Sequence, residues 1–260
     1  MKKPKIISVI NQKGGVGKTT TAVNTACYLA KSKYKVLIID ADPQANATSG
    51  VGINKDGIRT SLYDFLVGDT ALADVVFSTD IDNLDILVAN SALASLDHDL
   101  SGKENREFVM KTKLASKDFN KYDYILIDCP PSLGLLTINN LTASDYVLIP
   151  VQAEYYALEG LSQLLQVVQA VGKSYNPELE IAGVLVTMYD KRTVLSSQVY
   201  KELSNYFKTK MFKSIIPRNV KLAEAPSFGK PISEHDRWSK GARAYKSLTK
   251  ELVSRIGEEK

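Results

Sequence analysis

The sequence predicts an α/β fold: a doubly wound, mostly parallel β-sheet with helices on both faces, in one domain of residues 1–260. Short apolar runs recur along the chain, stretches with helical spacing separate most of them, and a glycine-rich turn follows the first run. Apolar runs without alternation are typical of parallel strands that are covered on both faces. Sheets of this kind bind ligands at the carboxyl ends of their strands.

The apolar runs give the expected strands in order. They cover residues 6–10, 36–39, 84–88, 124–127, 146–151, 181–186 and 212–216. Apolar residues at helical spacing predict helices between them, at positions 22, 26, 29 and 30, at 161, 164, 165 and 168, and at 199, 203 and 207. A final helix is expected over residues 240–256, docked on the sheet through Leu248 and Leu252. Residues 50–82 break the alternation with glycines and short helical pieces, and we expect a surface excursion beside the ligand site.

The glycine-rich turn has the residues of a phosphate-binding loop. A strand that leads through such a turn into a helix gathers backbone N–H groups at the positive end of the helix dipole. The glycines let the backbone curl around an anion, Lys18 can reach terminal phosphates, and the Thr19 hydroxyl can ligate Mg²⁺. The candidate phosphate-binding residues are Lys13, Gly14, Gly15, Val16, Gly17, Lys18, Thr19 and Thr20.

The loop departs from the usual G-x-x-x-x-G-K-[ST] pattern. Gln12 stands where that pattern has glycine, and an additional lysine, Lys13, precedes the glycine pair. From spacing alone, Lys13 is open to two interpretations, a solvated loop residue or a mobile charge that serves a phosphate site.

Four segments together resemble the deviant P-loop ATPases, most closely the ParA/Soj proteins that segregate chromosomes and plasmids. They are residues 13–20, 40–44 (DADPQ), 127–131 (IDCPP) and 216–220 (IPRNV). A single P-loop would indicate only a nucleotide-binding protein. Four segments in the family's order, within a resemblance that covers nearly the whole chain, are more specific, and they imply ATP and Mg²⁺ as cofactors.

The resemblance implies roles for the acidic residues at the strand ends. Asp128 would order Mg²⁺ through water while Thr19 ligates the ion, although a strand-end aspartate can also simply cap a turn. Asp42 would orient the attacking water, and Asp40, on the opposite side of an extended chain, would support the metal or the P-loop. The catalytic candidates are Lys13, Lys18 and Asp42, and the metal-site candidates are Thr19, Asp42 and Asp128.

Lys13 also has an implied role. In the family, the corresponding lysine crosses a dimer interface to the partner's nucleotide, much as an arginine finger supplies charge from outside. We therefore expect a homodimer in the ATP state, with low intrinsic turnover. Gly14 would leave room for the close approach of the second subunit.

Adenine recognition is expected from two further segments. Met188 follows a predicted strand, and residues 217–219 are similar to family segments that flank the base. The amide of Asn219 can pair with the donor and acceptor on the edge of adenine. Residues 217–219 could equally form a plain turn. The base-site candidates are Met188, Pro217, Arg218 and Asn219.

The C-terminal third is the basic part of the chain. The formal net charge is +4, but residues 185–260 hold 16 Lys and Arg against 8 Asp and Glu. This asymmetry indicates an anionic partner. The resemblance implies non-specific double-stranded DNA, released when a ParB-type centromere-binding protein stimulates hydrolysis. The candidate DNA contacts are Lys191, Arg192, Lys213, Lys221, Lys230, Lys240 and Arg243.

Other functional classes fit the sequence less well. A membrane-cycling ATPase similar to MinD would need a basic amphipathic tail, whereas this chain ends in residues 255–260, RIGEEK. A reductase similar to the nitrogenase iron protein would need cysteines for a cluster, and Cys27 and Cys129 are predicted to be core residues. His98 and His235 are expected at the surface.

The expected location is the cytoplasm, in association with the nucleoid and without stable membrane binding. No run of apolar residues and no leader precedes the first strand. The short N-terminus resembles the Soj-like form without a helix-turn-helix, so operator binding is not expected.

Overall fold

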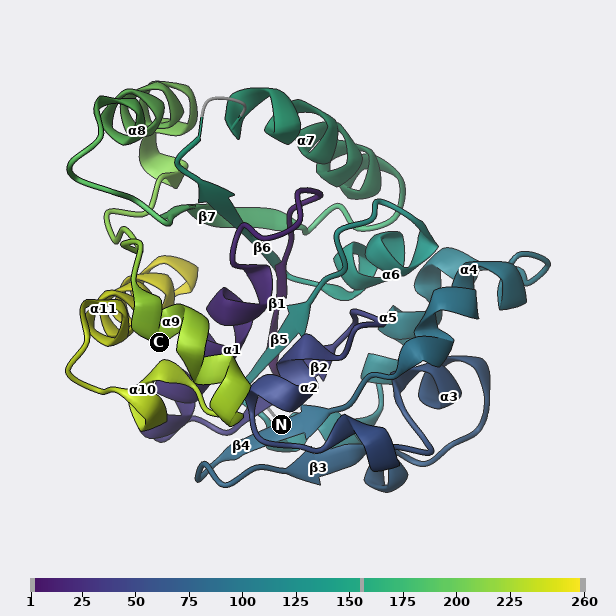
Figure 1. Ribbon diagram of the computed structural model, residues 1–260. Helices are drawn as coiled ribbons and strands as arrows, with labels where there is room; N and C mark the ends of the chain where they lie inside the picture. Colours follow the sequence, from purple (N-terminus) through teal and green to yellow (C-terminus); the bar gives the residue numbers. More distant parts are fainter. Residues whose placement is uncertain (1–2, 155–156, 258–260) are drawn as a thin grey trace.

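The computed structural model describes residues 3–154 and 157–257. A seven-stranded sheet in the order β3-β4-β2-β5-β1-β6-β7 forms the centre of the molecule (Figure 1). All neighbouring strands are parallel except β3, which runs antiparallel to β4 at one edge. The doubly wound, mostly parallel fold is therefore confirmed. The strands are β1 Lys5–Val9, β2 Val36–Asp40, β3 Val76–Ser78, β4 Leu84–Leu87, β5 Tyr124–Asp128, β6 Tyr146–Gln152 and β7 Glu180–Thr187.

The register of the three central strands brings their carboxyl ends together. Asp128, the last residue of β5, lies opposite Val9 of β1 on one side and Asp40 of β2 on the other. The glycine-rich loop continues from β1, and the segment with Asp42 continues from β2. The glycine-rich loop, Asp42 and Asp128 thus lie together at the carboxyl ends of the central strands.

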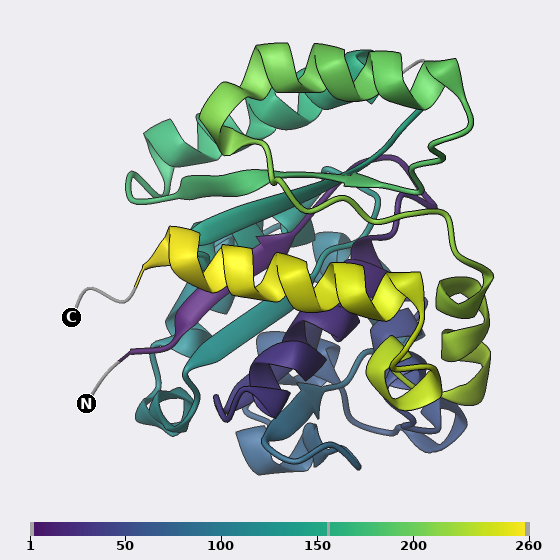
Figure 2. The same ribbon diagram turned by 90° about the vertical axis from the view of Figure 1, so that its left-hand side faces the viewer.

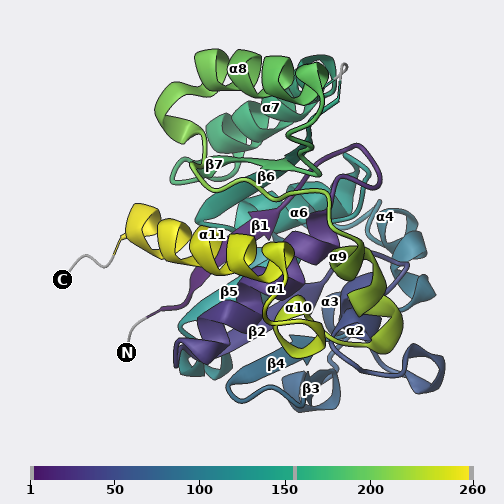
Figure 3. The same cartoon turned by 60° about the vertical axis from the view of Figure 1, so that its left-hand side comes forward.

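Helices cover both faces of the sheet and enclose two hydrophobic cores. One core lies between the sheet and α1, α10 and α11, and the other lies under α3, α5, α6, α7 and α8. Figure 3 shows α7 and α8 together beyond the β7 edge. The helices are α1 Lys18–Lys31, α2 Asn46–Gly50, α3 Leu62–Val67, α4 Leu96–Asp99, α5 Val109–Leu114, α6 Leu135–Ala143, α7 Ala157–Ser174, α8 Val194–Phe207, α9 Val220–Glu224, α10 Ile232–His235 and α11 Lys240–Ile256.

Helix α11 lies along one face of the sheet, yellow in Figure 2. Its apolar residues Leu248 and Leu252 are fully buried, and Tyr245 donates or accepts a hydrogen bond with Thr21 of α1 at 3.2 Å. The helix has the bounds that its apolar spacing predicts. Among the described residues, no helix combines the length and the apolar composition that crossing a bilayer requires.

The prediction of a strand over residues 212–216 is wrong. This segment runs beside β7, where the N–H groups of Phe212 and Ile216 donate to the carbonyls of Val184 and Val186. Between these two bonds, the N–H groups of Lys213 and Ser214 donate to the carboxylate of Glu251 in α11 instead. A side chain thus replaces the ladder, so the segment pairs only at isolated points.

Residues 50–82 hold more structure than the predicted surface excursion. The short helical piece expected at residues 61–66 is confirmed as α3, whereas the edge strand β3 was not predicted. Leu62, Phe65 and Val75 are buried in the core. Helix α3 begins at a capping box in which Ser61 accepts from the N–H of Tyr63 and donates to Asp64. Strand β3 is only three residues long and none of them is buried, so its sequence has too little apolar pattern to indicate a strand.

Candidate nucleotide site

The glycine-rich loop leaves β1 and curls back into the N-terminus of α1. Gly15 and Gly17 have φ values of 74° and 89°, a conformation that favours glycine. A Cβ at Gly14 or Gly15 would have no neighbour within 4 Å, so there is open space beside both residues. Helix α1 begins at Lys18 without any side chain capping its first N–H groups. The loop therefore offers free backbone donors at the positive end of a helix dipole.

Lys18 lies across the mouth of this loop. Its ammonium donates to the carbonyl of Lys13 at 3.1 Å, and the residue is only 7% exposed. Burial lowers the pKa of Lys18 below its ordinary value, while the charge of Asp128 opposes the shift. The lysine is held in place by the loop itself and not by a direct ion pair.

Asp128 is a buried carboxylate that lacks hydrogen-bond donors. It is fully buried at the end of β5, and neither carboxylate oxygen has a hydrogen-bond partner among the described residues. Burial and the neighbouring Asp40 raise its pKa well above the ordinary value, although Thr19 and Lys18 are close enough to oppose this. An uncompensated buried carboxylate is costly. A divalent cation, or water bound to one, would satisfy these oxygens.

The surroundings of Asp128 suit magnesium better than a transition metal. In residues 3–154 and 157–257, no three His, Cys, Asp or Glu side chains are grouped as a metal cage. Magnesium commonly binds through one or two protein oxygens together with phosphates and water. The Thr19 hydroxyl and the Asp128 carboxylate are ligands of that type.

Asp40 and Asp42 have separate surroundings. Asp40 is fully buried, and one carboxylate oxygen accepts from both the N–H and the hydroxyl of Thr48 at 2.7 Å, which fixes α2 against β2. Burial raises the pKa of Asp40 to about 6. Asp42 is 8% exposed, and its carboxylate accepts from the N–H of Gln44 at 2.9 Å. Both carboxylate oxygens of Asp40 are thus used to hold the fold together, whereas Asp42 can still accept further hydrogen bonds at the site.

A cavity of about 300 Å³ adjoins the loop on the side of α1 and β7. All four residues predicted to flank a base line it, together with Gly17 and Thr20 of the loop and Leu222 and Tyr245 from α9 and α11. The side-chain oxygen of Asn219 accepts from the N–H of Leu222 at 3.3 Å and caps α9. Its amide nitrogen makes no hydrogen bond within the described residues, so Asn219 both forms the turn and offers a donor. The predicted lining residues are Met188, Pro217, Arg218 and Asn219.

Sequence reasoning missed the contact that joins this cavity to the loop. The hydroxyl of Thr187, the last residue of β7, donates to the carbonyl of Val16 at 2.8 Å. Met188 follows with a positive φ of 51°, which is rare for a residue with a side chain. The only signal in the sequence was that Thr187 directly precedes a predicted base contact.

Comparison with known proteins identifies the family. A family model described as an AAA domain matches residues 4–181. The sporulation initiation inhibitor protein Soj of Bacillus subtilis is 54% identical over 250 residues, covering 96% of this chain and 98% of that protein. The chromosome partitioning protein ParA of Myxococcus xanthus is 47% identical, covering 96% and 88%. The chain belongs to the ParA/Soj family of partitioning ATPases.

Solved structures agree with the fold of this ParA/Soj-family chain. Cobyrinic acid a,c-diamide synthase from Mycobacterium smegmatis, with a bound ATP analogue and magnesium, superimposes with a TM-score of 0.83 at 34% identity. The alignment covers 95% of this chain and 93% of that one. That protein is named as a synthase and not as a partitioning protein. Soj and ParA are more similar to this chain in sequence.

In this family member, Lys13 contacts an acidic residue of its own chain. Its ammonium lies 2.9 Å from Oε2 of Glu154, and both side chains are 45% exposed. Gln152 donates to the other oxygen of Glu154 at 2.5 Å, and Asn11 accepts from the backbone N–H of Lys13. Lys13 thus faces outward, as expected, but within one chain it is already paired. No feature of the sequence indicated Glu154.

The seven basic residues predicted to contact DNA are all exposed, but their surroundings differ. Lys191 and Arg192 lie between β7 and α8, Lys213 beside β7, and the others in or near α9 and α11. Two of them are paired within the chain: Arg192 with Asp190 at 2.7 Å and Lys221 with Glu224 at 2.9 Å. The remaining five make no ion pair with any described residue, and are Lys191, Lys213, Lys230, Lys240 and Arg243.

Of the two cysteines and two histidines, Cys129 adjoins the site, because it directly follows Asp128. Cys27 and Cys129 are buried core residues, as predicted, and burial raises their pKa values. His98 is exposed, with 92% of its side chain accessible. His235 is not the free surface residue that was expected: only 14% of its side chain is exposed, and it contacts Glu224 and the ring of Phe228.

Proposed function

We propose that this chain is a partition ATPase whose ATP-bound form binds DNA non-specifically and releases it after hydrolysis. The observation that carries the proposal is the buried Asp128 carboxylate, which has no donor of its own and lies beside Thr19 and Lys18 at the open loop. The adjoining cavity of about 300 Å³ is suited to a base. Together these features match a nucleoside triphosphate with its magnesium ion.

Different residues would bind different parts of the nucleotide. Gly15, Gly17 and Lys18 would bind phosphate oxygens, and Thr19 and Asp128 would hold magnesium, which neutralises charge on those oxygens when bound. Asp42, a largely buried carboxylate at the same ends of the strands, would orient the attacking water. The amide nitrogen of Asn219 would donate to the acceptor on the edge of adenine.

Dimerisation would place Lys13 at the nucleotide of a second subunit. The exposed position of Lys13 supports this role. Because Lys13 is paired with Glu154 of its own chain, a bond to the partner's nucleotide would replace that ion pair. The exposed Gly14 would allow the partner to come close. ATP would then be part of the interface, and hydrolysis would separate the subunits.

DNA is the partner that the basic surface favours. The seven exposed cations would neutralise phosphates, and dimerisation would double their number. A ParB-type protein at a centromere would stimulate hydrolysis and so release the dimer from the nucleoid. The apolar residues of α11 are buried against the sheet, and this supports DNA over a membrane as the surface that is bound.

The test measures ATP hydrolysis by the chain alone, with duplex DNA, and with DNA plus the ParB-type protein of the same genome. We expect low turnover alone and clear stimulation only by the combination. Flotation with anionic liposomes and ATP, run beside a DNA mobility shift, distinguishes the two surfaces. A hydrolysis rate that neither DNA nor the ParB-type protein changes would contradict the proposal. So would flotation of the chain with liposomes when it causes no DNA mobility shift.

A further inference from the structure

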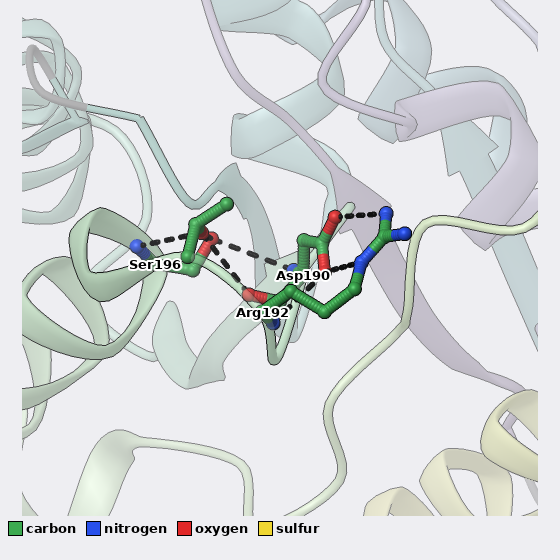
Figure 4. A network of polar contacts seen from close by, with 4 residues as sticks. Asp190, Arg192 and Ser196 are labelled. Carbon is green, nitrogen blue, oxygen red and sulfur yellow. Dashed lines mark hydrogen bonds and ion pairs between the residues drawn. The ribbon is translucent and has the colours of Figure 1, made fainter.

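Asp190 and Arg192 form a closed ion pair in the loop between β7 and α8 (Figure 4). The guanidinium binds the carboxylate through two parallel bonds, from Nε to Oδ1 at 3.0 Å and from Nη2 to Oδ2 at 2.7 Å. The backbone N–H of Arg192 also donates to Oδ1 at 3.0 Å. One carboxylate thus receives three bonds from a single residue, and both of its oxygens are engaged.

The frame around this pair is fixed by its neighbours. The carbonyl of Asp190 accepts from the N–H and the hydroxyl of Thr193, which caps α8. The backbone of Tyr189 bonds to Ile216 on one side and to Arg218 on the other. Only the arginine is free to leave, because 87% of its side chain is exposed against 21% for Asp190.

A guanidinium binds carboxylate and phosphate through the same planar fork. The two donors that face Asp190 are therefore those that a DNA phosphate would take. Lys191, the adjacent residue, makes no ion pair with any described residue, so it could bind a phosphate without first releasing a carboxylate. Bonds from Arg192 lower the pKa of Asp190, which keeps the competing carboxylate ionised.

We propose that Asp190 is an intramolecular competitor of DNA phosphate, which limits DNA affinity by holding the Arg192 guanidinium. This inference rests on the proposed DNA binding and deepens it, since it names the residue that regulates one contact. A DNA phosphate that binds Arg192 must displace the Asp190 carboxylate. The free energy of the Asp190–Arg192 ion pair is therefore subtracted from that of DNA binding.

The test compares Asp190→Asn with the unchanged chain. Asparagine still accepts the backbone bond from Arg192 but loses the charge, so the turn is retained. Asp236→Asn is the matched control, because Asp236 accepts the backbone N–H of Trp238 at 3.1 Å in a similar turn, and no arginine side chain in the described part of the chain binds it. Binding of the ATP-loaded proteins to a short labelled duplex is measured by fluorescence anisotropy at several salt concentrations.

We expect Asp190→Asn to raise DNA affinity by about two- to fivefold at low salt, the size of effect that exposed ion pairs produce. The gain should shrink at high salt, because exposed charges are screened. It should disappear when Arg192→Ala is added. Arg192→Ala alone should weaken binding.

The outcomes separate the two proposals. An equal gain in Asp236→Asn, or a gain that survives Arg192→Ala, would mean that Asp190 acts only through net charge and would overturn the inference. Equal affinity of Asp190→Asn and the unchanged chain would overturn it as well, while leaving the proposed function standing. Absence of DNA binding in every form, at every salt concentration, would overturn both.

Discussion

The ammonium of Lys13 lies 2.9 Å from Oε2 of Glu154, although the residues are far apart in sequence. If Lys13 serves the nucleotide of a second subunit, this pair must open first. Glu154→Gln should therefore lower the ATP concentration that gives half-maximal dimerisation by about two- to fivefold, since exposed pairs contribute up to about 1 kcal/mol. Sedimentation velocity against ATP concentration, in an Asp42→Ala background, measures the change.

Glu178→Gln provides the control, because Glu178 is an exposed glutamate without a described ion pair. Lys13→Ala should remain monomeric at every ATP concentration. An ATP requirement that is the same in Glu154→Gln and in the parent would show that the pair does not restrain dimerisation.

Asp42→Ala should retain ATP but hydrolyse it at least about 10²-fold more slowly, because a positioned carboxylate contributes that much to proton transfer. Phosphate release at saturating ATP, together with equilibrium binding of a fluorescent ATP analogue, separates the two effects. Asp56→Ala, at an exposed loop aspartate, should behave as wild type. Normal turnover of Asp42→Ala would remove this residue from the mechanism.

Asn219→Ser should weaken ATP binding about fivefold, because it removes an amide donor from the base cavity, and one such hydrogen bond contributes about 1 kcal/mol. Serine still caps α9, so the melting temperature should not change. The turnover number at saturating ATP should be unaffected. Isothermal titration with ATP and with GTP measures the loss, and equal affinity for ATP in both forms would exclude a base contact.

Glu251 provides a prediction about acid stability. Burial alone would raise the pKa of its carboxylate, but bonds from the N–H groups of Lys213 and Ser214 and from Arg255 outweigh it, so the pKa lies below the ordinary value of 4.5. A lowered pKa in the folded state stabilises the protein above pH 4.5, and this stabilisation is lost as pH falls through the folded pKa.

Glu251→Gln should lower the free energy of unfolding by about 1–2 kcal/mol at pH 7, where the bonds to the charged carboxylate are complete. The difference from wild type should narrow below pH 4.5, as the wild-type carboxylate takes up its proton. Urea denaturation across this pH range measures both. Glu202→Gln, at an exposed position of α8, should show no difference at any pH.

Gly241→Ala should destabilise the chain by about 1–3 kcal/mol through overpacking. A Cβ at this position would lie 2.6 Å from Cγ of Leu222, where α9 approaches α11. Since Leu222 also lines the base cavity, the KM for ATP should rise. Gly102→Ala, which has open space around it, is the control for urea denaturation and kinetics. Equal stability would show that α9 can shift without cost.

The central strands and the P-loop could be predicted because local sequence determines them. Residues 36–39 and 124–127 are continuous apolar runs, and the structure buries every one of them. The segment 212–216 was predicted as a strand for the same reason, yet two of its N–H groups donate to a glutamate of α11. A hydrogen bond between such distant positions leaves no trace in local apolar patterning.

The site residues that sequence reasoning missed share one physical cause. Glu154 and Thr187 reach the loop only after β6 has paired with β1 and β7 with β6, so their roles depend on the assembled sheet. Asp190 differs, since it binds a residue two positions away. Its pairing depends on rotamers of a turn, which spacing alone cannot specify.

The two ends of the described chain lie together, at the edge of the sheet opposite the P-loop. The ammonium of Lys5 in β1 donates to the carbonyl of Ile256 at 2.6 Å, and Figure 2 shows both ends on the same side. Neighbouring ends favour circular permutation. A short linker could join them, and a new opening could be placed at the exposed turn around Gly102, where a Cβ would have open space.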